Sequence, residues 1–182
     1  MPTGKRDAHF RAVDAYIQKH YQPPKAFSVI DALGGTLRNG TQHASGGAPS
    51  ELVLQGILDA VMSAASRTFA EQLIILMERS GEKPASIYAK AGITKQHFSK
   101  IKNNADYKPT KETALAFAIA LHLSLPETKD LIGRAGFTLS PSSKRDLIVE
   151  YFIKEKIYDV DEINYNLNVR GFGTLTNRRN IM

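Results

Sequence analysis

The chain has 182 residues, of which 42% are apolar, and it carries a formal net charge of +6 at neutral pH. This apolar content suffices for an ordered core and excludes a chain that is disordered throughout. The absence of cysteine excludes disulfides and thiolate metal sites. No apolar run approaches the roughly 20 residues of a membrane span, and the first residues lack the apolar segment of a signal peptide. We therefore expect a soluble, cytoplasmic protein without a membrane partner.

Residues 1–49 are expected to form a helical arm followed by a flexible linker. Apolar residues recur at helical spacing over residues 7–21, which predicts an amphipathic helix. They are Phe10, Val13, Ile17 and Tyr21. The Pro23-Pro24 pair ends this helix, and the glycine-rich stretch that follows is typical of a linker. The four apolar side chains are a candidate surface for a protein partner.

Residues 50–167 are expected to form one helical domain. Ser50 suits the cap of a first helix over residues 51–64. The capping box formed by Thr68 and Glu71 opens the next helix, which ends at a Ser-Gly pair. The domain therefore begins with two helices before its central motif.

The central motif consists of two short helices with a tight turn between them. Pro84 suits the first turn of one helix, which Gly92 closes, and Thr94 caps the second, over residues 95–103. The short separation predicts a helix-turn-helix over residues 84–104.

Four further helices are predicted after this motif. Their start signals are Thr110, the Ser124–Glu127 capping box, Ser140-Pro141 and the Asp159–Glu162 capping box. No stretch alternates convincingly with a period of two, so no strand is predicted. The expected fold class is all-α.

Positive charge is concentrated around the predicted helix-turn-helix. Residues 83–111 contain seven lysines and a single acid, Asp106, so this window carries seven minus one, or +6. A solvated lysine face without a ligand is one interpretation of such a cluster. Its coincidence with the motif favours a nucleic-acid surface.

The second helix of the motif has the side chains that reading DNA requires. Phe98 and Ile101 are three residues apart and share the inward face. Glutamine and asparagine can pair with adenine, and lysine with guanine or phosphate. The candidate DNA contacts are Thr94, Lys95, Gln96, His97, Ser99, Lys100, Lys102, Asn103, Asn104, Tyr107 and Lys108. Base contacts are expected from Gln96 and Ser99, phosphate contacts from Lys95, Lys100, Lys102 and Lys108, and either from His97.

The segment from Ile75 to Ile132 resembles the lambda-repressor-like, or Xre-type, family of helix-turn-helix domains. The matching positions are Ile87, Ala91, Gly92, Ile93, Thr94, Phe98-Ser99-Lys100-Ile101, Asn103-Asn104, Tyr107-Lys108-Pro109-Thr110 and Leu121-His122-Leu123-Ser124-Leu125. The resemblance covers about a third of the chain. It implies a helical bundle that binds double-stranded DNA, here with extra C-terminal helices and the N-terminal arm. Modules of this size usually read two half-sites as a dimer, so a homodimer is expected.

One position departs from the family pattern. Many members have a glutamine that supports the second helix on DNA where this chain has Pro84, which offers neither that side chain nor a backbone N–H. A narrower resemblance is to a bacterial subfamily found alone or appended to domains such as macrodomains. It rests on Tyr16-Ile17, His20–Pro24, Phe98–Ile101, Asp106–Pro109, Glu127–Leu131 and Leu139–Lys144.

Residues 168–182 are expected to form a basic tail. After Glu162 the chain contains no acid, and the tail carries Arg170, Arg178 and Arg179. A frayed tail is the favoured interpretation, and an arm that touches DNA phosphates is the alternative.

Three functional hypotheses remain at this point. The first is sequence-specific DNA binding for transcriptional control. The second is a protein-interaction module, an antitoxin or an adaptor of a stress or defence system, that docks a partner through residues 1–49. RNA binding is the third. The five histidines form no metal-ligand pattern and no phosphate loop or triad stands out, so no catalytic residue, metal or cofactor is predicted.

Overall fold

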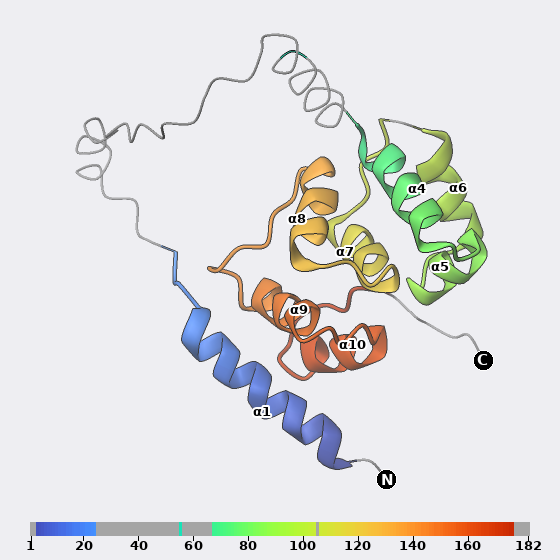
Figure 1. Ribbon diagram of the computed structural model, residues 1–182. Helices are drawn as coiled ribbons and strands as arrows, with labels where there is room; N and C mark the ends of the chain where they lie inside the picture. The colour runs from blue at the N-terminus through green and yellow to red at the C-terminus, as the bar shows by residue number, and fades with distance from the viewer. Residues whose placement is uncertain (1–2, 25–54, 56–66, 105, 177–182) are drawn as a thin grey trace, which may run out of the picture. The chain divides into compact units, whose positions relative to one another are not determined.

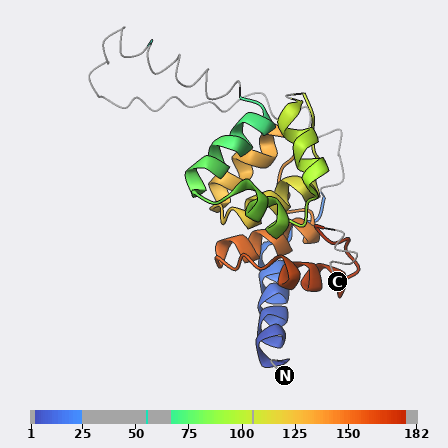
Figure 2. The ribbon, with the colours of Figure 1, turned by 90° about the vertical axis from the view of Figure 1, so that its right-hand side faces the viewer.

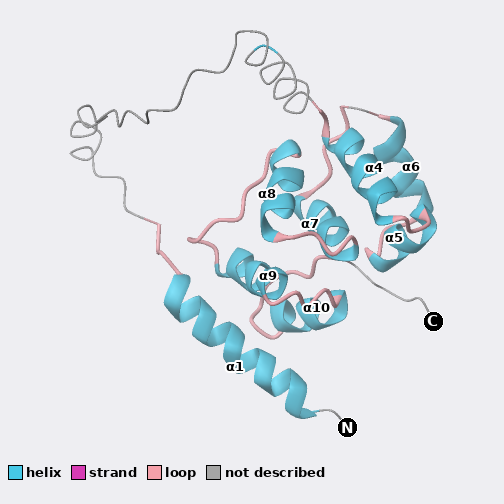
Figure 3. Ribbon diagram, in the orientation of Figure 1, coloured by secondary structure: helices cyan, strands magenta, loops and turns pink. Residues whose placement is uncertain are grey.

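The computed structural model describes residues 3–24, 55, 67–104 and 106–176. All regular structure in these ranges is helical, as Figure 3 shows, so the all-α prediction is confirmed for this part of the chain. The helices are α1 (Thr3–His20), α4 (Phe69–Ser80), α5 (Pro84–Lys90), α6 (Lys95–Asn103), α7 (Lys111–Ala120), α8 (Leu125–Arg134), α9 (Lys144–Lys154) and α10 (Val160–Asn168). None of the described helices combines the length and apolarity needed to cross a bilayer.

Side-chain caps start most of these helices where the sequence predicts them. The Thr68 hydroxyl accepts a hydrogen bond from the Glu71 amide (3.3 Å), and the Glu71 carboxylate accepts one from the Thr68 amide (2.8 Å). The side chains of Thr110 and Asp159 also accept hydrogen bonds from the first amides of α7 and α10, without the reciprocal bond of a capping box. These bonds satisfy amides that a helix start would otherwise leave unpaired.

Three predicted boundaries differ from the structure or fall outside it. Helix α1 begins at Thr3, before the predicted start at residue 7. Helix α9 begins after its cap Ser143 and not at Ser140, because the Ser140 amide donates to the Asp146 carboxylate (2.9 Å) in a preceding turn. The helix predicted over residues 51–64 lies outside the described residues, apart from Gln55.

Helix α7 is the centre of the core. Every residue from Thr113 to Ala120 is buried. Helices α5, α8 and α10 all contact α7, while α4 packs on α8 and α6. A helix that is covered on all sides in this way holds the elements around it by apolar packing.

Helix α1 packs against the rest of the protein, on the side away from α4, α5 and α6 (Figure 1 and Figure 2). Val13 is fully buried. The Tyr16 hydroxyl donates to the Glu150 carboxylate on α9 (2.9 Å) and accepts from the Lys154 ammonium (2.6 Å). Residues 3–22 thus belong to the same compact unit as residues 67–176, and α1 is not a separate arm.

The residues after α10 are also packed, in contrast to the expected frayed tail. The Arg170 guanidinium donates to the Asp14 carboxylate (2.8 and 3.0 Å) and to the Phe10 carbonyl (2.9 Å). Leu175 is buried in the core. Residues 170–176, which we name the strap, therefore lie along the folded unit. Arg178 and Arg179 are outside the described residues.

The contact between α1 and α9 should weaken in acid. Burial alone would raise the pKa of Glu150, but hydrogen bonds from Lys154 and Tyr16 outweigh it and hold this pKa below the ordinary value of 4.5. A carboxyl with a lowered folded-state pKa contributes stability above its unfolded value and loses it as the pH falls through the folded value. Wild type should therefore lose more free energy of unfolding than Glu150→Gln between about pH 7 and about pH 3.5, measured by urea titration.

The exposed Glu155→Gln on the same segment is the matched control and should lose as much as wild type. Equal losses in wild type and Glu150→Gln would contradict the prediction.

At alkaline pH the same contact should weaken as the pH rises, because the hydrogen bond to Glu150 raises the pKa of Lys154 above 10.5. The stability that protonated Lys154 contributes is fully present below the ordinary value of 10.5 and is lost as the pH rises through the raised folded-state pKa.

Candidate nucleic-acid interface

Helix α6 is positioned by the turn that precedes it. Gly92 has φ of +66°, a left-handed conformation that favours glycine. Its amide donates to the Ala89 carbonyl (2.9 Å), and the Ile93 amide donates to the Tyr88 carbonyl (2.8 Å). The Thr94 hydroxyl then accepts from the His97 amide (3.2 Å) and starts α6. The chain thus reverses from α5 into α6 within a few residues.

The inward face of α6 is apolar, as predicted. Ile101 is fully buried. The Phe98 ring stacks on Tyr88 of α5, with centroids 5.4 Å apart, and lies 6.3 Å from the ring of Phe117 on α7. These contacts attach α6 to both neighbouring helices and leave its other face to solvent.

The outward face of α6 is polar and accessible. Gln96, Ser99 and Asn103 follow spacings of three and four residues and so share one side of the helix. Of the predicted DNA contacts, the exposed ones are Thr94, Lys95, Gln96, Ser99, Lys100, Lys102, Asn103, Asn104 and Lys108. His97 and Tyr107 are half-buried at the edge of this face. All eleven predicted residues thus lie on α6, at its cap Thr94 or on the loop that follows the helix.

The lysines of the basic window divide into two groups. Lys111 pairs with the buried Asp146 carboxylate (2.6 Å), and Lys90 with Glu82 (2.7 Å). The other group has no ion pair with any described carboxylate and consists of Lys83, Lys95, Lys100, Lys102 and Lys108. The positive charge that is not balanced locally is thus centred on α6.

Several predicted contact residues also bond within the protein. The His97 ring nitrogen Nε2 lies 3.1 Å from the Tyr107 hydroxyl, and the Lys100 ammonium lies 5.5 Å from the centre of the Tyr107 ring. The Asn103 amide donates to the Ser99 hydroxyl (3.2 Å). These contacts hold the side chains in place on the outward face.

Two other predicted contacts have a structural role at the ends of α6. The Thr94 hydroxyl is the N-terminal cap described above. The Asn104 side-chain oxygen accepts from the Asp106 amide (3.1 Å) and closes the turn after the helix. Both side-chain oxygens thus already accept a hydrogen bond within the protein.

A hollow of about 370 Å³ adjoins the start of α6. Its lining includes five threonines, Thr94, Thr110, Thr113, Thr174 and Thr176, together with Glu112. Burial alone would raise the pKa of Glu112, but its own backbone amide and the charge of Arg145 lower it. Glu112 is therefore ionised, and its charge is balanced by the Arg145 guanidinium (3.0 Å). Among the described residues no lysine or arginine lines the hollow, so the lining does not favour an anion. The placement of Thr174–Thr176 beside α6 was not predicted, since no local pattern relates segments so far apart in the chain.

The apolar residues predicted to bind a partner are largely used inside the protein. Val13 is fully buried, and Ile17 packs against the same core. The Phe10 ring lies under the Arg170 guanidinium at 4.0 Å, and the Tyr21 ring lies 5.1 Å from the Lys144 ammonium. The prediction is therefore corrected for Val13, which is inaccessible while α1 packs on α9. The other three side chains are half-buried, and their role in binding a partner stays a prediction.

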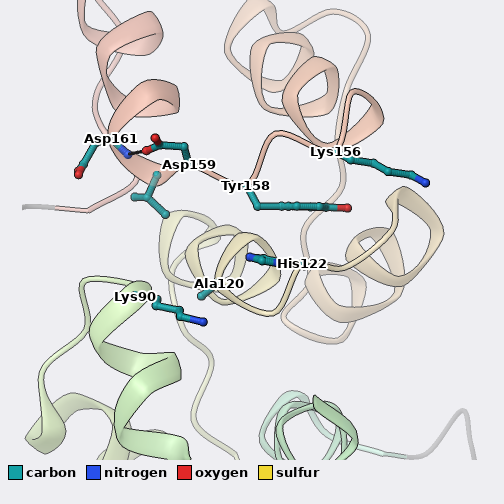
Figure 4. A pocket seen from close by; sticks show the side chains of 8 residues that line it. Lys90, Ala120, His122, Lys156, Tyr158, Asp159 and Asp161 are labelled. Atoms are coloured by element: carbon teal, nitrogen blue, oxygen red, sulfur yellow. Dashed lines mark hydrogen bonds between the residues drawn. The ribbon is translucent and has the colours of Figure 1, made fainter. Parts of the chain in front are cut away.

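A second hollow, of about 770 Å³, lies between α5, the end of α7 and the start of α10 (Figure 4). The ring of His122 stacks on that of Tyr158, with centroids 4.7 Å apart, and both rings are seen edge-on in the figure. Cations and carboxylates both line this hollow, and the Asp159 carboxylate caps α10. The mixed charge does not select one class of ligand. No cluster of three or more metal-ligating side chains occurs among the described residues.

Compared with protein-family models, with curated proteins and with solved structures, the chain gives no match. A functional proposal must therefore come from the chemistry of the surface itself.

Proposed function

We propose that this chain binds double-stranded DNA through the outward face of α6, as a helix-turn-helix protein of the lambda-repressor-like type that controls transcription. The observation that supports this most directly is the set of exposed lysines on and after α6 without an ion pair to a described carboxylate. Such a surface attracts phosphates because binding releases the counterions of DNA.

The arrangement of the polar side chains supports base reading in addition to charge attraction. Gln96, Ser99 and Asn103 share the outward side, and Lys95 and Lys100 flank them on the same helix. Amide side chains in the major groove can form paired hydrogen bonds with adenine, while flanking lysines hold the backbone. Helix α6 would then lie in the groove, with the lysines at its edges.

A homodimer is part of this proposal. One short helix contacts only a few base pairs, and proteins of this kind gain specificity by placing two such helices about 34–36 Å apart, one turn of DNA.

Pro84 is the first residue of α5 and is exposed. It has no side-chain amide, so it cannot supply the contact that glutamine makes in the lambda-repressor-like family, which this segment resembles. The exposed Lys83 beside it offers a phosphate contact in its place.

The interaction-module hypothesis is less well supported than DNA binding. It depended on an apolar face of α1 that packs within the chain's own unit. RNA binding remains a competing outcome, because exposed lysines attract any phosphate backbone. Competition between duplex DNA and RNA for the protein distinguishes these two outcomes.

Binding of a labelled random duplex of about 30 base pairs, titrated with salt, tests the function. The logarithm of the affinity should fall linearly with the logarithm of the salt concentration, with a slope near −4 if about four phosphates are neutralised. Unlabelled single-stranded DNA and structured RNA, added as competitors, should displace the labelled duplex from the protein poorly. The absence of duplex binding at low salt, or preferential displacement by RNA, would overturn the proposal.

A further inference from the structure

The strap spans the protein from α1 to the turn before α6. At its first residue, Arg170 donates to Asp14 and to the Phe10 carbonyl of α1. Further along, the Gly173 carbonyl accepts from Arg145 of α9 (3.4 Å). The strap thus has fixed contacts to several helices before it reaches Thr176.

Asn164 of α10 holds the far end of the strap with both ends of its side-chain amide. The carbonyl oxygen of this amide accepts from the Leu175 backbone amide (2.8 Å). Its NH₂ group donates to the Thr176 hydroxyl (3.3 Å). Leu175 itself is 3% exposed and packed in the core, so the far end of the strap is held by one apolar anchor and two hydrogen bonds.

Thr176 lies directly against Gly92, the glycine of the α5–α6 turn. A Cβ atom added to Gly92 would lie 3.0 Å from the Thr176 Cβ and 3.1 Å from its hydroxyl oxygen. The turn therefore has no free space on this side. Thr94, the cap of α6, follows two residues later and lines the same hollow as Thr176.

We infer that Asn164 and Thr176 are positioning residues of the DNA-binding surface: they hold the strap against Gly92 and thereby set the placement of the start of α6. This inference rests on the proposed DNA-binding function. Base reading requires side chains held to within about 0.5 Å, whereas phosphate attraction tolerates larger displacements. Loosening the strap should therefore reduce sequence discrimination more than non-specific binding.

The variant that tests this is Asn164→Ala, with Asn164→Asp as the conservative rescue. The aspartate oxygen can still accept from the Leu175 amide, and a second acceptance from the Thr176 hydroxyl replaces the lost donation. Asn168→Ala is the matched control, because Asn168 lies on the same helix and is exposed. Thr176→Ala provides a second test in case Asn164→Ala does not fold.

Affinities are measured for a duplex selected by the wild-type protein from a random pool and for random duplex, well below the melting temperature. Asn164→Ala should bind the selected duplex on the order of tenfold more weakly and change by less than about twofold on random duplex. Asn164→Asp and Asn168→Ala should stay within about twofold of wild type on both. Equal loss on both duplexes, or no loss on either, would overturn the inference.

Hydrogen exchange provides a readout that does not depend on DNA. Amides of residues 92–98 should exchange on the order of tenfold faster in Asn164→Ala than in Asn168→Ala. If wild type fails to bind duplex while this exchange effect is seen, the proposed function fails and the positioning of α6 by the strap stands. Unchanged exchange in Asn164→Ala and Thr176→Ala would overturn the positioning role itself.

Discussion

Replacing the four lysines of the α6 surface with glutamine should reduce the affinity for duplex DNA by up to about 10³-fold at low salt. The four are Lys95, Lys100, Lys102 and Lys108. An exposed ion pair contributes up to about 1 kcal/mol, so four contacts account for at most about 4 kcal/mol, and about three powers of ten is the upper limit of the expected loss. The slope of affinity against salt should also become less steep by about 3 to 4.

The matched control removes four exposed charges on other parts of the chain, also by glutamine. These are Arg11, Lys19, Lys129 and Lys156. The control changes the net charge equally, so it separates a local surface from attraction by the whole protein. Equal losses in the two variants would show that α6 is not the binding surface.

Gln96→Ala provides a second contrast. This change should weaken binding to a selected duplex by about 1–3 kcal/mol and leave the salt slope unaltered, because it removes a base contact and no charge. A changed slope with no loss of discrimination would argue against a base contact by this residue.

Ile101→Ala should lower the free energy of unfolding by about 2–5 kcal/mol. Ile101 is fully buried and anchors α6 to the core, so truncation removes apolar contacts and leaves a cavity. Because a domain typically has only about 5–15 kcal/mol of stability, this single change should take a large part of it. Urea denaturation measures the effect.

Two variants on the same helix calibrate that measurement. Ile101→Val should cost about 0.5–1.5 kcal/mol, since it removes one methylene. The exposed Gln96→Ala should stay within about 0.5 kcal/mol of wild type. A loss below about 1 kcal/mol for Ile101→Ala would contradict the packing of α6 through this residue.

Local sequence signals predicted much of the helical architecture. Helix α6 begins after Thr94 and ends at Asn103, where the sequence places it, because the cap and the apolar pair act within one or two turns. The capping box at Thr68 also forms as predicted. Helix α9 was predicted to begin too early, since its true cap depends on how Asp146 is used by the preceding turn.

The candidate interface could be predicted from the sequence to the extent that it lies on one element. Its polar residues occupy α6 and the following loop, so their shared face follows from helical periodicity. Whether the nearby lysines are balanced could not be predicted. Lys111 pairs with Asp146, which is 35 residues later in the chain and which only the folded structure brings within 2.6 Å.

By itself, the sequence determined the all-helical class of the described residues, the start of α6 and the polar character of its outer face. These features depend on caps, spacing and side-chain chemistry within a few residues of one another. Only the tertiary structure decided that α1 packs on α9 and that the strap reaches Gly92. Those contacts join residues from distant parts of the chain, and their partners are chosen by burial and hydrogen bonding in the assembled core, for which no local pattern exists.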